Sequence, residues 1–345
     1  MGFLNRFNLS RDMGIDLGTA NTLIYVSGKG IVLEEPSVVA IERKTETPRA
    51  FGKEAKLLLG RAPENIEALR PLKDGVIADF DATEAMIHEF VRRVFEGNPL
   101  VHPRMVIGIP SGVTKLERRA VIEAASNAGA REVDLIEEPL AAAIGAGLPV
   151  AEPTGNMIVD IGGGTTEVAV LSSQGKVISE SIRIAGDELT EAIVNQMKKE
   201  HKLAIGENTA ETIKLQLGSA YPVKDDDSTM EVRGLHMLSG LPRSVDVKAS
   251  EIRECLQDPV NSIIEAIKRT LEQTPPDLAA DIIDRGIMLA GGGAMLRGLD
   301  VFISHETGIV THIAPEPLKC VVLGTGRVLE DKSLDRVFSD RSTLN

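Results

Sequence analysis

Residues 157–170 read MIVDIGGGTTEVAV, an apolar run that contains an aspartate, then three glycines, then a second apolar run. Residues 13–26, MGIDLGTANTLIYV, show the same pattern about half a chain earlier. Short apolar runs joined by a glycine turn are typical of paired strands. Because the pattern recurs at so large a distance, we predict two lobes of common topology, each built around such a strand, turn and strand.

The composition is that of an acidic globular protein. The 345 residues are 43% hydrophobic and 26% charged, with a formal net charge of −13. This length favours two lobes over one small core. The negative charge and an aromatic content of 3% argue against nucleic acid as a partner. Two cysteines without metal-ligand spacing predict a reducing, cytoplasmic setting, and no apolar run is long enough to predict a membrane-spanning helix.

Glycine turns follow apolar runs at three places and could surround a polyphosphate. A residue without a Cβ allows backbone N–H groups to approach phosphate oxygens closely. Most glycine turns only reverse the chain, but three in this position favour a nucleotide. Their residues are Gly18, Thr19, Ala20 and Asn21; Gly162, Gly163, Gly164 and Thr165; and Gly291, Gly292, Gly293 and Ala294.

Two aspartates, Asp16 and Asp160, precede the first two glycine turns by two residues. At the carboxyl end of a strand such side chains point towards a ligand. Mg²⁺ prefers few protein carboxylates, with water and phosphate completing its shell. One aspartate from each lobe suits that preference, and the alternative is that each aspartate caps its own hairpin.

Other phosphate-binding and catalytic motifs are absent from the sequence. Neither GxxxxGK[ST] nor GxGxxG occurs, and there is no GxSxG. His88-Glu89 begins like HExxH, but Arg92 stands where the second histidine would be. Zinc chemistry and covalent catalysis therefore have no support.

Several segments resemble a known superfamily. DLGTAN (16–21), DIGGGTTEVAV (160–170), EEPLAAAIGAG (137–147) and GIMLAGGGAMLRGL (286–299) resemble the phosphate-1, phosphate-2, connect and adenosine motifs of the actin, heat-shock chaperone and sugar-kinase superfamily. Within it, IDLGTANTLIYVSGKGIVLEEPSVVAI, LRPLKDGVIADF and IGIPSGVTKLERRA resemble the MreB family of bacterial actins. The resemblance covers residues 12–330.

The resemblance implies an α/β, actin-like fold. Each of two lobes would have a mixed β-sheet flanked by helices, with the nucleotide in the cleft between the lobes. The expected limits are residues 12–150 for lobe I, with a small subdomain at about 33–75 and a C-terminal return at about 320–345; 151–319 for lobe II, with a small subdomain at about 187–254; and 1–11 for an amphipathic or disordered leader. We expect the polar tail after Val328 to be frayed.

The family also implies roles for the site residues. Asp16 and Asp160 would hold Mg²⁺ through water, and the turns at 18–21 and 162–164 would clasp the β- and γ-phosphates of ATP. The turn at 291–294 would back the adenosine. Actin has a lysine after its first turn, where this chain has Thr22 and Leu23. Charge neutralisation would then rest on Mg²⁺ and backbone donors, which implies slow hydrolysis to ADP.

Two further groups complete the predicted site. In the connect motif Glu138, directly before Pro139, would polarise the attacking water. Its neighbour Glu137 is the alternative candidate for this role. Adjacent residues at a strand end point opposite ways, so only one of them can face the phosphate. Glu211 and Lys214 would reach the ribose and the base edge. At spacing i, i+3 they could equally form a surface ion pair.

A filament whose ATPase acts as a timer is the expected function. The chain lacks room for a chaperone's peptide-binding domain, and we find no hexose pocket for a kinase; a monomeric ATPase or small-molecule kinase is the alternative. The resemblance implies membrane-associated paired filaments, at the inner face of the cytoplasmic membrane, that determine rod shape and organise peptidoglycan synthesis. It also implies partners among cell-wall elongation proteins of the MreC, MreD and RodZ type.

Five apolar residues are the candidate membrane contacts. Phe3, Leu4 and Phe7 lie at helical spacing around Arg6, and a disordered leader is the alternative. Leu100 and Val101, in the segment 97–103, are a second candidate, for which a partly buried turn is the alternative.

Overall fold

The computed structural model describes residues 12–96, 102–224, 227–331, 333–334 and 340–343. The chain divides into two compact units. Unit 1 comprises Met1–Pro153, Leu171–Lys176 and Leu318–Asn345, and unit 2 comprises Thr154–Val170 and Val177–Pro317. The short segment Leu171–Lys176 thus belongs with unit 1, although the chain on both sides of it belongs with unit 2.

The main sheet of unit 1 has the strand order β19-β10-β9-β1-β2-β3. β1 runs antiparallel to β2 and parallel to β9, which is in turn parallel to β10. The strands are β1 (Met13–Leu17), β2 (Asn21–Val26), β3 (Gly30–Pro36), β9 (Arg104–Ile109), β10 (Glu132–Glu137) and β19 (Asp340–Thr343).

Helices cover both faces of this sheet. Met13 and Ile15 of β1 are buried with Met86 and Phe90 of α2 on one face, whereas Gly14 faces Thr325 of α11 on the other. Side chains alternate across a strand, so β1 is apolar on the α2 face and needs a small residue at position 14 on the α11 face. The helices are α2 (Phe80–Val94), α3 (Lys115–Asn127), α4 (Glu138–Ala146) and α11 (Cys320–Glu330).

A smaller part of unit 1 follows β3. It is a sheet of order β5-β4-β6 with a short helix and a two-stranded ribbon. Its elements are β4 (Val39–Glu42), β5 (Thr47–Phe51), α1 (Lys53–Lys56), β6 (Ile66–Leu69), β7 (Leu72–Lys73) and β8 (Val76–Ile77).

For the described residues after Val328, the expectation of a frayed tail is wrong. α11 continues to Glu330, whose Oε1 accepts hydrogen bonds from the Tyr25 hydroxyl (3.1 Å) and the Gly28 backbone N–H (3.0 Å). Further on, β19 pairs antiparallel with β10. Backbone pairing with a sheet edge needs no apolar side chains, so a polar tail can still form a strand.

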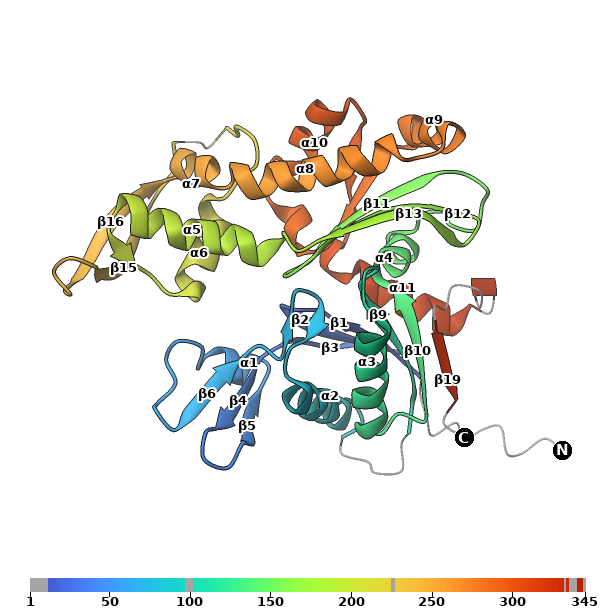
Figure 1. Ribbon diagram of the computed structural model, residues 1–345, viewed down its shortest axis with the longest axis horizontal. Helices are drawn as coiled ribbons and strands as arrows, with labels where there is room; N and C mark the ends of the chain where they lie inside the picture. Colours follow the sequence, from blue (N-terminus) through green and yellow to red (C-terminus); the bar gives the residue numbers. More distant parts are fainter. Residues whose placement is uncertain (1–11, 97–101, 225–226, 332, 335–339, 344–345) are drawn as a thin grey trace. The chain divides into compact units, whose positions relative to one another are not determined.

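α4 and α11 lie side by side with their backbones in contact (Figure 1). A Cβ built on Gly145 would lie 1.7 Å from the carbonyl oxygen of Cys320, and one on Gly324 would lie 1.8 Å from that of Ala141. The Arg327 guanidinium also donates to the Ile144 carbonyl. Glycine is therefore required at both crossing points.

Unit 2 repeats the topology of unit 1. Its main sheet has the order β13-β12-β11-β17-β18, which corresponds to β3-β2-β1-β9-β10. As in unit 1, the later strands are parallel to the first. The duplication predicted from residues 13–26 and 157–170 is thus present in the strand order. The strands are β11 (Asn156–Ile161), β12 (Thr166–Ser172), β13 (Gly175–Ile182), β17 (Ile287–Ala290) and β18 (Thr311–Ile313).

The remaining elements of unit 2 are mostly helices packed around one apolar core, with a small sheet of order β14-β15-β16. They are α5 (Gly186–Glu200), β14 (Leu203–Ala204), α6 (Glu207–Leu217), β15 (Thr229–His236), β16 (Pro242–Lys248), α7 (Ala249–Cys255), α8 (Gln257–Glu272), α9 (Pro276–Arg285), η2 (Gly292–Met295) and α10 (Leu299–Thr307). The short helix η3 (Pro317–Lys319) lies at the boundary with unit 1. In the part of the chain that the structure describes, no helix is both long and apolar enough to span a bilayer.

Gly145→Ala should destabilise the protein. The added methyl group would overlap the Cys320 carbonyl oxygen, and overpacking of this kind costs about 3 kcal/mol. That cost outweighs the gain of roughly 1 kcal/mol that alanine brings to a helix interior. Urea denaturation followed by circular dichroism measures the change. Gly175→Ala is the control, because its Cβ would make only an ordinary 3.7 Å contact. Equal midpoints for Gly145→Ala and the unmodified chain would show that α4 and α11 can move apart freely.

Candidate functional site

In unit 1 the predicted acidic residues meet at one edge of the main sheet. Asp16 lies near the carboxyl end of β1, and Glu138 directly follows β10, with β9 between these strands. The three strands are parallel, so their carboxyl ends share an edge. A Cβ on Gly108 of β9 would lie 3.4 Å from Cγ of Glu138 and 3.9 Å from the carbonyl oxygen of Ile15.

The first glycine turn joins β1 to β2 and is held from behind by Ser37. The Ser37 hydroxyl donates to the Gly18 carbonyl at 2.6 Å, and its backbone N–H donates to that of Ala20 at 3.0 Å. Thr19 Oγ1 accepts from the Gly75 N–H at 3.1 Å. These contacts occupy carbonyl and hydroxyl groups of the turn. Sequence reasoning missed Ser37, because a single serine between two strands belongs to no phosphate-binding motif.

Asp16 is electrostatically unusual. Burial raises its pKa from 3.8 to about 7, because a carboxylate removed from water loses the solvation of its charge. A nearby cation would compensate for that loss. The burial of Asp16 beside a glycine turn therefore fits a water-bridged Mg²⁺ ion, with Asp16 as one of its holders.

The adjacent residues Glu137 and Glu138 have different surroundings. Glu137 Oε2 lies 2.6 Å from Lys176 Nζ, and its Oε1 lies 3.6 Å from the Arg118 guanidinium. The Ser111 hydroxyl donates to Glu137 Oε2 at 3.3 Å. Glu138 is the first residue of α4, with its stem beside Gly108. The Glu137 carboxylate is thus held by two cations and a hydroxyl.

In unit 2 the second glycine turn joins β11 to β12 and is braced by the start of α5. The Gly162 N–H donates to the Thr165 carbonyl at 2.9 Å and closes the turn. The N–H groups of Gly186 and Asp187 donate to the carbonyls of Gly162 and Gly163 at 3.2 and 2.8 Å. The carbonyls of the turn therefore face α5.

The third glycine turn packs directly on Asp160 and Ile161. Gly291 has a positive φ of 78°, and a Cβ there would lie 2.5 Å from Asp160 Oδ1 and 2.3 Å from the Ile161 carbonyl oxygen. A Cβ on Gly293 would lie 2.2 Å from Cγ2 of Ile161. Ala294, in η2, is buried. Only glycine allows this turn to approach the end of β11, which brings the second and third turns together.

Glu211 and Lys214 form the i, i+3 ion pair on α6 that was the alternative to their expected contact with the nucleotide, with 2.7 Å between Oε2 and Nζ. This ion pair is also hydrogen-bonded to α5. Lys214 Nζ donates to the Gly186 carbonyl at 2.8 Å and to Thr190 Oγ1 at 2.9 Å, and its side chain is only 13% exposed. Because Gly186 also holds Gly162, this pair is connected to the second glycine turn.

The predicted membrane contacts Phe3, Leu4, Phe7, Leu100 and Val101 lie outside the described residues.

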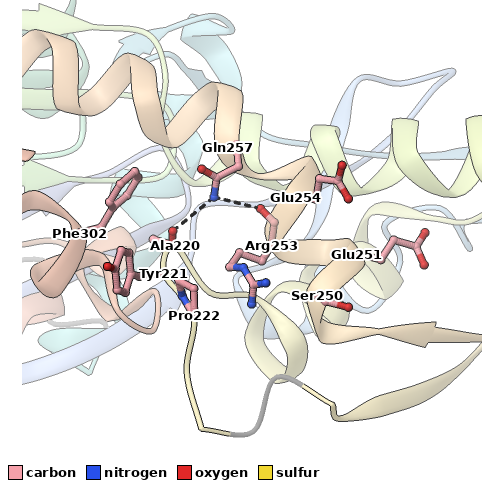
Figure 2. A pocket seen from close by; sticks show the side chains of 9 residues that line it. All are labelled: Ala220, Tyr221, Pro222, Ser250, Glu251, Arg253, Glu254, Gln257 and Phe302. Carbon is pink, nitrogen blue, oxygen red and sulfur yellow. Dashed lines mark hydrogen bonds between the residues drawn. The ribbon is translucent and has the colours of Figure 1, made fainter. Parts of the chain in front are cut away.

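Unit 2 also holds a separate cavity of about 530 Å³ (Figure 2). The rings of Tyr221 and Phe302 lie 5.7 Å apart at one side of it, and Gln257 Nε2 donates to the Ala220 carbonyl at 3.3 Å. None of the predicted site residues lines it. Its lining residues are Ala220, Tyr221, Pro222, Ser250, Glu251, Arg253, Glu254, Gln257 and Phe302.

Comparison with known proteins gives consistent matches over nearly the whole chain. A family model described as "MreB/Mbl protein" matches residues 10–336. The cell shape-determining protein MreB of Escherichia coli K12 is 54% identical over 326 residues, which are 93% of this chain and 94% of that protein.

Solved structures agree with this result. A crystal structure of MreB5 of Spiroplasma citri bound to ADP has a TM-score of 0.89 at 37% identity, covering 95% of this chain and 98% of that one. The same relative bound to AMPPNP gives a TM-score of 0.87. The MamK double helical filament, at 22% identity, has a TM-score of 0.79 and covers 92% of this chain and 98% of its own, which shows the shared fold. These matches confirm the predicted actin-like α/β fold.

Asp16→Asn should stabilise the nucleotide-free protein, and more so at high pH. The folded-state pKa of Asp16, about 7, lies above its unfolded value of about 3.9. Stability from this group is therefore complete below about pH 4 and is lost as the pH rises to about 7. Asparagine removes the buried charge, so the gain in melting temperature should be larger at about pH 8 than at about pH 5. Thermal denaturation at both pH values measures it, with the exposed Asp227→Asn as control. A gain that does not change with pH would contradict the prediction.

Proposed function

We propose that this chain, which belongs to the MreB/Mbl family, binds ATP, hydrolyses it slowly and assembles into filaments in response to the nucleotide. One observation supports ATP binding above all. In both repeats an aspartate and a glycine turn stand at the same place in the same strand order, and a third glycine turn contacts Asp160. The ADP-bound and AMPPNP-bound structures of the Spiroplasma citri relative support the same conclusion.

We assign the residue roles as follows. The turns at 18–21 and 162–165 donate backbone N–H groups to the phosphates, since several of their carbonyls already accept hydrogen bonds from Ser37 and from the start of α5. The turn at 291–294 supports the adenosine. Glu211 and Lys214 reach the ribose and base edge from α6, where the Gly186 contact keeps Lys214 near the second turn.

Asp16 and Asp160 would hold Mg²⁺ through water. When bound, this ion neutralises phosphate charge and orients the β- and γ-phosphates. The two aspartates serve that purpose by standing directly before the phosphate-binding turns, and the raised pKa of Asp16 is the sign of a carboxylate that lacks solvation.

Glu138 is the proposed group that orients the attacking water. Support comes from its neighbour, because the Glu137 carboxylate is bound to Lys176, Arg118 and Ser111. Phosphoryl transfer depends mostly on positioning and electrostatics, so a fixed carboxylate that holds the water in line suffices. Such a group contributes about 10²–10⁴-fold to the rate.

Filament assembly is supported by an exposed apolar tip on unit 2. Leu238 is 81% exposed at the end of the β15–β16 hairpin, and Met237 and Leu241 beside it are more than half exposed. Clustered apolar side chains in contact with water favour association with another chain. We propose that these filaments determine rod shape and organise peptidoglycan synthesis with MreC-, MreD- and RodZ-type membrane proteins. A monomeric kinase is the alternative, and it would need no such tip.

Glu138→Ala should bind ATP and still assemble, but release phosphate about 10²–10⁴-fold more slowly, so its polymer persists. Asp16→Ala should lose Mg²⁺-ATP binding and assembly together, because the metal is required before chemistry. Phosphate release is measured beside pelleted polymer, with and without ATP, for both variants and for Glu137→Ala. Polymer that is independent of ATP in the unmodified chain would favour the monomeric alternative. If Glu137→Ala stopped phosphate release while Glu138→Ala left it intact, the assignment of Glu138 would be wrong.

We also propose that the filament lies on the inner face of the cytoplasmic membrane through Phe3, Leu4, Phe7, Leu100 and Val101. Each large apolar side chain that enters the bilayer contributes about 1.5–3 kcal/mol, so one monomer binds weakly and a filament binds by avidity.

A chain lacking residues 1–9 and carrying Leu100→Ser and Val101→Ser should lose co-sedimentation with anionic phospholipid vesicles. Leu57→Ser, at a different exposed leucine, is the control and should bind like the unmodified chain. Equal binding by the truncated and unmodified chains would remove the proposal.

A further inference from the structure

Lys176 lies in a short segment that belongs to unit 1, although the chain before and after this segment belongs to unit 2. Residues 171–176 form the tip of the β12–β13 hairpin, and we call them the strap. Its β12 end continues directly back to Thr165 of the second glycine turn. β12 thus leads from the second glycine turn, in unit 2, to the strap, in unit 1.

The backbone of the strap is held tightly. Ser173 and Gln174, at its turn, both have positive φ values, of 52° and 60°. Neither is glycine, and this conformation is unfavourable for such residues unless the surroundings impose it. Here the Ser173 N–H donates to the Glu152 carbonyl at 2.9 Å, and that of Gln174 donates to the Val150 carbonyl at 2.6 Å. Both carbonyls belong to the segment that follows α4.

Lys176 reaches the opposite end of the same helix. Its Nζ lies 2.6 Å from Oε2 of Glu137, the N-cap residue of α4. α4 has nine residues and is therefore about 13 Å long. The strap consequently contacts α4 before its first turn and after its last one, so it resists sliding of the helix along its axis.

The Lys176–Glu137 ion pair is suited to fix both the position and the direction of the first turn of α4. Both side chains are mostly removed from water, at 31% and 17% exposed, so the pair is screened less than a surface pair. Arg118 and Ser111 bind the same carboxylate from α3 and the segment before it. Glu137 is therefore fixed from several sides at the residue directly before Glu138. With Glu137 held, the peptide that leads into Glu138 has little freedom.

We infer that Lys176 is a positioning residue for hydrolysis: by binding Glu137 it fixes the start of α4, and thereby aims Glu138 at the water that attacks ATP. This inference rests on the proposed ATPase function. Lys176 acts through Glu137 and needs no contact with the nucleotide, so its loss should lower the rate of the chemical step and leave nucleotide affinity almost unchanged. Displacement of a reacting group by about 1 Å can cost about 10²-fold.

The test compares Lys176→Met, Lys176→Arg and Glu137→Gln with the unmodified chain. Single-turnover phosphate release measures the chemical step, and titration with a fluorescent, non-hydrolysable ATP analogue measures affinity. Lys176→Met should release phosphate about 10-fold to 10²-fold more slowly, with affinity within about twofold. Lys176→Arg should restore most of the rate, because it restores the charge. Lys199→Met, at an 80% exposed lysine of α5, is the matched control and should behave like the unmodified chain.

A double variant gives a second readout that a general loss of stability would not reproduce. If Lys176 acts through Glu137, then Lys176→Met combined with Glu137→Gln should be no slower than the slower single variant. A double variant whose rate falls by the product of the two single losses would overturn the inference. So would a Lys176→Met rate of phosphate release within about twofold of that of the unmodified chain. An unmodified chain that binds the analogue but releases no phosphate would instead overturn the proposed ATPase function, and this inference with it.

Discussion

The backbone contact between α4 and α11 is the constraint on which much of unit 1 depends. Gly145 and Gly324 let the two helices meet at a distance that excludes any side chain between them. α11 in turn packs on β1, where the absence of a side chain at Gly14 leaves space for Thr325. One helix of this pair therefore supports the strand that carries Asp16, and the other begins with Glu138. A small change in the crossing would shift both acidic groups relative to each other.

The acidic groups of the site differ in how the protein compensates for the burial of their charge. Asp16 is half-buried, and the partial loss of water around its carboxyl raises its pKa. Glu137 is also mostly buried, but Lys176 and Arg118 neutralise it. Asp16 and Glu137, at the same sheet edge, thus differ in the source of the positive charge near them. One has its cations supplied by the protein, and the other is suited to a cation that arrives with a ligand.

The duplicated topology explains why so much of the site lies on turns. In each unit the first strand of the repeat ends at a glycine turn, and the parallel strand beside it ends at the same edge. In unit 2 that neighbouring strand contributes the Gly291 turn, and in unit 1 the next one along contributes Glu138. The same framework therefore presents different chemistry in its two copies, because the residues at the corresponding strand ends differ.

Short-range patterns were enough to predict the strand and turn repeat, and to place two aspartates and three glycine turns at the ends of strands. Each of these depends on residues within a few positions of one another, where the need for backbone without a Cβ or for an apolar strand is visible directly. The actin-like fold also followed from the motifs, and the solved relatives confirm it.

Other features were decided by tertiary structure alone. Ser37 supports the first turn, β19 pairs with β10 at the sheet edge, and Lys176 forms an ion pair with Glu137. Each of these contacts joins residues far apart in the chain, and a single lysine, serine or polar strand has many possible partners. Which partner it meets is determined by how the sheets and helices pack, because that packing sets the distances over which a hydrogen bond or an ion pair can form.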